Sequence, residues 1–131
     1  MNSAETEVLS LLDSYVRAVE SKSLEQYASV VAHDPAMVNF GAFGAPILGW
    51  ESLRHVMDGK NAALESIRIE QDDVSVHLLP TQDDAWARSL WRFHAKSEGN
   101  ELDLPVRCTW QLQRRDGQWR VVHFRKSIAA G

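Results

Sequence analysis

The stretch that decides the fold runs from Leu102 to Ser127 and reads LDLPVRCTWQLQRRDGQWRVVHFRKS. At its centre Asp116-Gly117 separates two runs that are rich in apolar residues. An Asp-Gly pair in this position is a strong signal for a β-hairpin, because Gly adopts positive φ without strain and Asp hydrogen-bonds its own backbone. Before the turn, three apolar residues alternate with four polar ones: Cys108, Trp110 and Leu112 with Arg107, Thr109, Gln111 and Gln113. This period of two predicts a half-buried antiparallel strand, and the β-branched and aromatic run from Trp119 to Arg125 predicts its partner.

The N-terminal half is expected to be mainly helical. Apolar residues recur at helical spacing over residues 4–21, which predicts an amphipathic helix. A second helix is expected from Leu24, behind a capping box formed by Ser23 and Gln26, and Asp34-Pro35 should end it. After it we expect a short strand at 37–40, a segment at 47–49 that returns after a tight turn, and a third helix at 50–60.

The chain from Ser66 onward is expected to form strands. Ile67 and Ile69 differ in parity from Val74 and Val76, so a β-bulge is predicted near residues 71–73. A long strand over 85–96 and a turn at Gly99-Asn100 lead into the hairpin. Because helices come first, strands follow and no β-α-β alternation is present, the fold class is α+β.

The hairpin sequence also resembles a known family. The run R-x-T-W-x-L-x-R-R-D-G-x-W-R-V-V-H-F-x-x-S is similar to the last hairpin of SnoaL-like proteins in the nuclear-transport-factor-2-like superfamily. It is especially similar to the association (hub) domain of calcium/calmodulin-dependent protein kinase II. The resemblance covers nearly the whole chain and implies a single domain, residues 1–131, with a cystatin-like cone: a curved antiparallel sheet packed on three N-terminal helices. This fold hosts isomerases, dehydratases, hydrolases, cargo adaptors and oligomerisation domains, so it does not define a function.

Composition excludes several classes of function. The net charge is −4 without a block of Lys or Arg, which argues against nucleic acid as a partner. No apolar segment approaches the roughly 20 residues of a membrane span, and no secretory signal is visible, so a cytoplasmic protein is expected. Cys108 is the only cysteine, and the five histidines lack metal-binding spacing, so we expect no disulfide, metal or cofactor.

The resemblance to the steroid-isomerase branch of the superfamily implies which positions would carry chemistry. That branch uses a carboxylate base, a tyrosine and a second, protonated acid. Tyr15 matches the tyrosine, but Phe40 falls at the base, and Trp110 (or Thr109 in a shifted register) falls at the second acid. Because a phenyl or indole ring cannot accept a proton from carbon, the isomerase mechanism is expected to be absent.

The kinase hub's pocket arginines are replaced in the same way. Their positions hold Trp91, Trp110 and Lys126, so an apolar or aromatic ligand is expected rather than an anionic one of the hub type. The predicted ligand-binding residues are Tyr15, Phe40, Trp91, Trp110 and Lys126, and the expected partner is a small apolar or aromatic molecule. Each ring equally fits a plain core position, and Lys126 equally fits a solvated charge.

Two further hypotheses stay open. The chain is a lyase, isomerase or hydrolase if His94 or His123 acts as the base and Tyr15 as the acid. It is an oligomerisation module if it works as the kinase hub does. By analogy with the superfamily, Arg107, Thr109, Gln111 and Gln113 on the outer sheet face are candidates for a homodimer interface.

Overall fold

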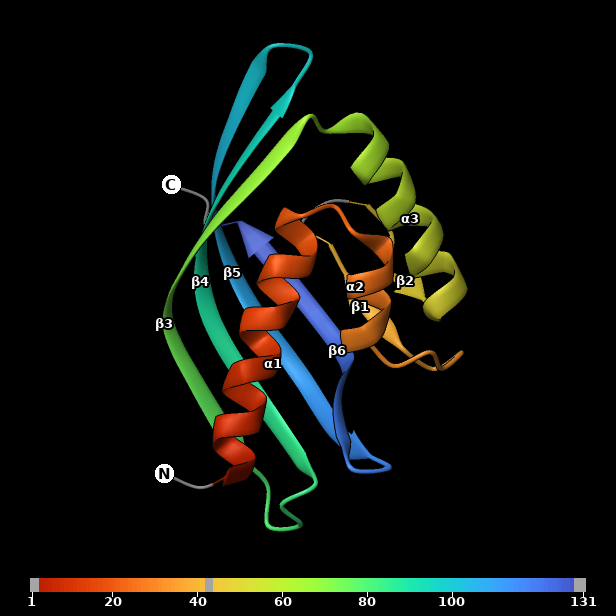
Figure 1. Ribbon diagram of the computed structural model, residues 1–131, viewed down its shortest axis with the longest axis vertical. Coiled ribbons are helices and arrows are strands. Elements are labelled where there is room, and N and C mark those ends of the chain that lie inside the picture. Colours follow the sequence, from red (N-terminus) through yellow and green to blue (C-terminus); the bar gives the residue numbers. More distant parts are fainter. Residues whose placement is uncertain (1–2, 42–43, 129–131) are drawn as a thin grey trace.

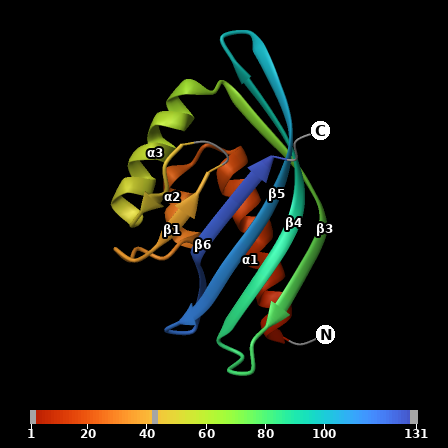
Figure 2. The same cartoon turned by 180° about the vertical axis from the view of Figure 1, so that it is seen from behind.

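In the computed structural model, which describes residues 3–41 and 44–128, helices cover one face of a single curved sheet. Figures 1 and 2 show all three helices on the concave side, with α1 lying along the strands. The helices are α1 (Ser3–Glu20), α2 (Leu24–Val30) and α3 (Trp50–Ala63). The strands are β1 (Val38–Phe40), β2 (Ile47–Leu48), β3 (Ser66–Leu78), β4 (Asp84–Ser97), β5 (Asn100–Arg115) and β6 (Gln118–Ile128).

The six strands form one unclosed sheet in the order β2-β1-β6-β5-β4-β3. The pairs of long strands are antiparallel, as expected, but β1 runs parallel to β6, so the sheet is mixed. The α+β class and the cystatin-like arrangement predicted from the sequence are therefore confirmed, with one short parallel pair added. That pair holds the β1–β2 segment beside the C-terminal strand.

Local signals in the sequence account for most element boundaries. The backbone N–H of Gln26 donates to Ser23 Oγ over 3.1 Å, which is the predicted cap of α2. The helix ends at Val30, earlier than Asp34-Pro35 indicates. The predicted bulge in β3 lies between Asp72 and Ser75, where the register with β4 shifts.

The hairpin that decides the fold has the predicted faces. Along β5, Val106, Cys108, Trp110 and Leu112 are buried, whereas Arg107, Thr109 and Gln111 are exposed. The first set faces the helices and builds the core, and the second lies on the outer face of the sheet. The alternation of apolar and polar residues therefore gives the orientation of the strand correctly.

One glycine before α3 has a required role. Gly49 has φ of +83°, and a Cβ at this position would lie 3.2 Å from the carbonyl oxygen of Pro35. Any other residue here would combine backbone strain with a close contact. Gly49 thus sets the direction in which α3 leaves β2, and α3 is the helix that faces the cavity described next.

Candidate ligand-binding site

An apolar cavity of about 270 Å³ lies between α3 and the sheet. This volume is just below the range of roughly 300–1,000 Å³ that holds drug-sized ligands, so it suits a smaller molecule. Its wall is made by the following residues: Asn39, Gly41, Ile47, Leu53, Val56, Met57, Lys60, Leu64, Trp91, Phe93, Leu104, Val106, Lys126 and Ile128.

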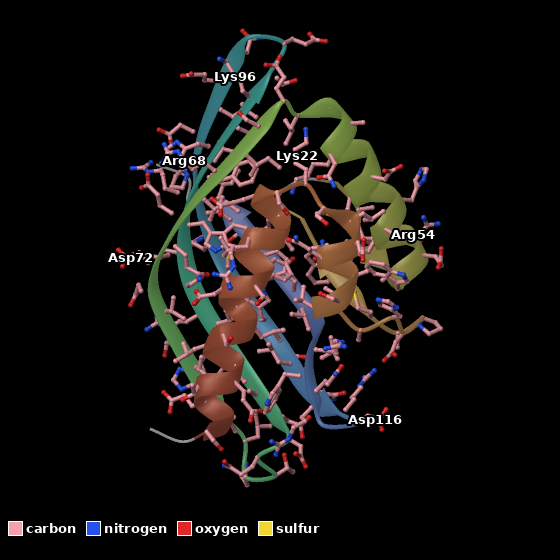
Figure 3. The ribbon with its side chains drawn as sticks, viewed as in Figure 1. Lys22, Arg54, Arg68, Asp72, Lys96 and Asp116 are labelled. Atoms are coloured by element: carbon pink, nitrogen blue, oxygen red, sulfur yellow. The ribbon has the colours of Figure 1, made fainter. Side chains whose placement is uncertain are left out.

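Helix α3 contributes one side of this wall. Leu53, Met57, Lys60 and Leu64 recur every three or four residues, so they share one face of the helix and its extension. Leu53 and Met57 are buried, and Lys60 continues their stripe into the last helical turn. Arg54, by contrast, lies on the side of α3 that is turned away from the sheet (Figure 3). The stripe therefore presents a mostly apolar surface with one amine at its end.

The sheet contributes the opposite side, and Trp91 on β4 is its largest ring. The indole Nε1 of Trp91 donates to Gln71 Oε1 over 3.0 Å, and the same oxygen accepts a hydrogen bond from Ser89 Oγ at 2.9 Å. Because the polar edge of the indole is hydrogen-bonded to Gln71 on β3, the ring presents only carbon atoms to the cavity. This ring is a fixed apolar platform rather than a hydrogen-bond donor to a ligand.

The cavity wall also contains a buried amide, the side chain of Asn39 on β1. Its side chain is only 6% exposed, and its Oδ1 has no hydrogen-bond partner among the described residues. A buried amide oxygen without a partner costs free energy, so a ligand that donates a hydrogen bond here would recover it.

Two lysines give the cavity its electrostatics. The ammonium groups of Lys60 and Lys126 lie 5.6 Å and 5.9 Å from the centroid of the Phe93 ring. Burial, together with the charge of Lys126, lowers the pKa of Lys60 to about 7. Burial also lowers the pKa of Lys126. The wall holds no Asp or Glu among the residues that the structure describes, so carboxylate-based proton abstraction has no base here.

The structure brings three of the predicted ligand-binding residues together. Tyr15, Trp91 and Trp110 belong to an aromatic cluster with Tyr27 and Phe124, in which the ring centroids of contacting pairs lie 5.1–6.3 Å apart. Of this cluster only Trp91 lines the cavity. Tyr15 and Trp110 are fully buried beyond it, and the Tyr15 hydroxyl lies 3.1 Å from that of Tyr27. Trp91 and Lys126 are therefore the predicted residues that reach the cavity.

Phe40 and the two histidines lie elsewhere. Phe40 is 37% exposed and meets His123 edge-on, with centroids 5.3 Å apart. The Nδ1 of His123 lies 3.0 Å from the carbonyl oxygen of Val38, and His94 lies on the outer face near Glu70 and Asp103. None of these residues lines a cavity with Tyr15. In the part of the chain that the structure describes, the acid–base pair required by the histidine hypothesis is thus not assembled.

Two residues of the site were missed from the sequence, although each left a signal. Asn39 stands between apolar neighbours Val38 and Phe40, and a strand turns alternate residues to opposite faces, so either Asn39 or Phe40 had to face inward. Lys60 follows Leu53 and Met57 at helical spacing, so its half-buried side chain continues the same inward-facing stripe. Lys60 was not predicted as a site residue because charged residues usually lie in solvent.

Across residues 3–41 and 44–128, no cluster of three or more His, Cys, Asp or Glu side chains is arranged to hold a metal ion. The same residues contain no helix that is long and apolar enough to span a membrane.

A curved sheet covered on its concave face by three helices is the arrangement of the nuclear-transport-factor-2-like, cystatin-like fold. The chain belongs to the SnoaL-like domain family, whose model matches residues 8–131. No curated protein sequence matches the chain.

Solved structures share the fold at low sequence identity. An NTF2-like protein with a cystatin-like fold from Novosphingobium aromaticivorans superposes with a TM-score of 0.83, at 18% identity over 98% of this chain and 84% of its own. A proposed dehydratase of the NTF2-like family from Streptomyces avermitilis gives 0.88, at 14% identity over 98% of both chains. A proposed calcium/calmodulin-dependent protein kinase II association domain from Xanthomonas campestris gives 0.80, at 20% identity over 94% and 86%.

Proposed function

We propose that this chain binds a small, mainly apolar molecule in the cavity between α3 and the sheet. The observation that carries the proposal is the lining: carbon surface from Trp91, Phe93 and the α3 stripe surrounds a few polar groups. Ligand sites commonly have this composition, in which apolar walls supply affinity and isolated polar groups fix orientation. Within the predicted set, Trp91 and Lys126 are the proposed contacts, whereas Tyr15 and Trp110 support the wall from behind.

Blocking the mouth of the cavity should abolish binding. Val56 lines the cavity from α3 but is itself partly exposed, so Val56→Trp should place an indole into the opening without disturbing the buried core. For a small aromatic probe such as benzyl alcohol, we expect affinity to fall by about tenfold or more, since the lost contact area is most of a small ligand's binding energy. Amide chemical-shift titration measures this affinity directly. In the unmodified protein, addition of the probe should shift the amide resonances of the wall residues on β5 and β6.

A matched control lies one residue away. His55 is exposed on α3 and lines no cavity that the structure describes, so His55→Trp adds the same ring to the same helix outside the site. It should leave the titration unchanged. Equal effects of the two variants, or shifts that map to the outer sheet face, would contradict the proposed site.

We also propose that the outer face of the sheet is the interface of a homodimer. Beside the polar residues Arg107, Thr109 and Gln111, this face exposes two large apolar side chains of β4, Trp86 (44%) and Leu90 (46%). Apolar groups within a polar surface support a contact between copies. Leu90→Arg should convert a dimer to a monomer in sedimentation equilibrium at micromolar concentration, whereas a wild-type monomer under these conditions would refute the interface.

A cytoplasmic location stays a prediction.

A further inference from the structure

Two lysine amines share one apolar cavity and approach the same ring. Lys60 reaches it from the last turn of α3, and Lys126 reaches it from β6. Both ammonium groups lie within 6 Å of the Phe93 centroid, at 5.6 Å and 5.9 Å. The two side chains come from segments far apart in the sequence, so the tertiary fold brings the amines together.

Neither amine has a counter-charge. Among the described residues, no carboxylate lies within 4.0 Å of either Nζ, and neither Nζ makes a hydrogen bond, whereas surface cations such as Arg88 pair with acids. The other titratable groups nearby, Lys22 and Cys108, supply no negative charge near pH 7. A third lysine of this region, Lys22, donates a hydrogen bond to the carbonyl oxygen of Leu64 and adds positive charge. Burial raises the pKa of the Cys108 thiol to about 12, so this thiol is neutral near pH 7.

An amine in such a place is a nucleophile. A lysine that is desolvated beside another cation loses its proton near neutral pH, and its lone pair then attacks carbonyl carbon. The neighbouring ammonium supplies positive charge where a carbonyl oxygen gains electron density. Asn39, in the same wall, offers a buried Oδ1 without a partner to a hydroxyl donor.

We propose that Lys60 forms an imine with a small, mainly apolar aldehyde or ketone bound in the cavity. The Nζ lone pair forms a bond to the carbonyl carbon, and transfer of a proton from nitrogen to oxygen gives a carbinolamine. The carbon–oxygen bond then breaks, the hydroxyl leaves with a proton as water, and a carbon–nitrogen double bond forms. No oxidant or reductant takes part. This inference rests on the proposed function, because the carbonyl compound must first occupy the cavity.

Reductive trapping tests the proposal. The protein is incubated with benzaldehyde and sodium cyanoborohydride at pH 7, which reduces an imine to a stable benzylamine, and the adduct is mapped by peptide mass spectrometry. Lys60 should be labelled at least about ten times faster than Lys96, an exposed lysine labelled at the upper end of the molecule in Figure 3, because far more of its amine is neutral at this pH. Equal labelling of Lys60 and Lys96, or a single adduct on Lys126, would overturn the assignment.

Variants separate the imine from simple binding. Lys60→Arg keeps a cation but forms no stable imine, so the fast adduct should disappear, whereas Lys96→Arg should leave it unchanged. Lys126→Met removes the neighbouring charge, so labelling of Lys60 should need a higher pH than in the wild type. Unchanged pH dependence in Lys126→Met would contradict the coupling of the two amines.

Benzyl alcohol, which has the same size but no carbonyl, separates failure of the imine from failure of the site. If benzyl alcohol shifts cavity resonances and protects Lys60 while the wild type labels rapidly, both proposals hold. If benzyl alcohol binds in the cavity but Lys60 labels no faster than Lys96, the imine alone is refuted. If benzyl alcohol does not bind and labelling is uniform, the proposed function itself fails.

Discussion

Replacing Trp110 by alanine should lower the free energy of unfolding by about 3–5 kcal/mol, the largest loss expected from any single side chain here. Trp110 is 1% exposed and contacts the rings of Tyr15, Trp91 and Phe124, with centroids 5.1–6.0 Å away. Its removal leaves a large cavity where the hairpin meets α1, and the surrounding rings cannot all collapse into it. Urea denaturation followed by circular dichroism measures the change.

Two controls give this prediction its meaning. Trp86→Ala, made in the monomeric Leu90→Arg background, removes the same side chain from the outer face of β4, where the indole is 44% exposed and stacks on His77, and should cost less than about 1 kcal/mol. Trp110→Phe keeps a ring and removes an indole N–H that has no partner in the described structure, so it should cost well under half as much as the alanine change. If the phenylalanine and alanine variants were equally unstable, ring packing would not explain the role of Trp110.

The second large effect concerns pH. We expect stability to rise between about pH 7 and pH 8.5, by up to about 1.4 kcal/mol per pH unit from Lys60 alone. The pKa of Lys60 is about 7 in the fold because burial and Lys126 disfavour the cation, whereas an unfolded lysine titrates near 10.4. Above pH 7 the unfolded state therefore binds more protons than the folded state, and raising the pH favours the fold.

The rise has an upper limit set by other buried groups. Burial raises the pKa of Cys108 to about 12 and that of Tyr27 to about 12, whereas the unfolded thiol and phenol ionise near 8.5 and 10. The unfolded state thus loses these protons first, so stability should level near pH 9 and fall above about pH 10. Urea midpoints measured from pH 6 to 11 would trace this curve.

Lys60→Met is the test variant for the pH curve. It replaces the amine with an apolar side chain of similar length at the same half-buried position of α3. It should flatten the rise in stability between pH 7 and 8.5 and raise stability at pH 7. Lys96→Met, at an exposed site, should leave the curve unchanged. A rise that survives in Lys60→Met would assign the proton release to another group.

The site was only partly predictable from sequence. The helical stripe and the inward face of β5 were readable because apolar residues recur at 3.6 or 2.0 positions. The resemblance to relatives with catalytic acids placed Phe40 in the pocket, but β1 turns Asn39 inward and Phe40 outward, towards His123. A single residue of register decides this choice, and a strand of three residues carries too little pattern to set it.

The sequence by itself determined the α+β class, the Asp-Gly hairpin and the aromatic interior, because periodicity and turn chemistry act locally along the chain. Only the tertiary structure decided which groups meet in the cavity. Lys60 and Lys126 come from a helix and a strand 66 positions apart, and their shared loss of solvent follows from how α3 lies over the sheet. Desolvation and charge repulsion depend on distances in space, and no local pattern encodes them.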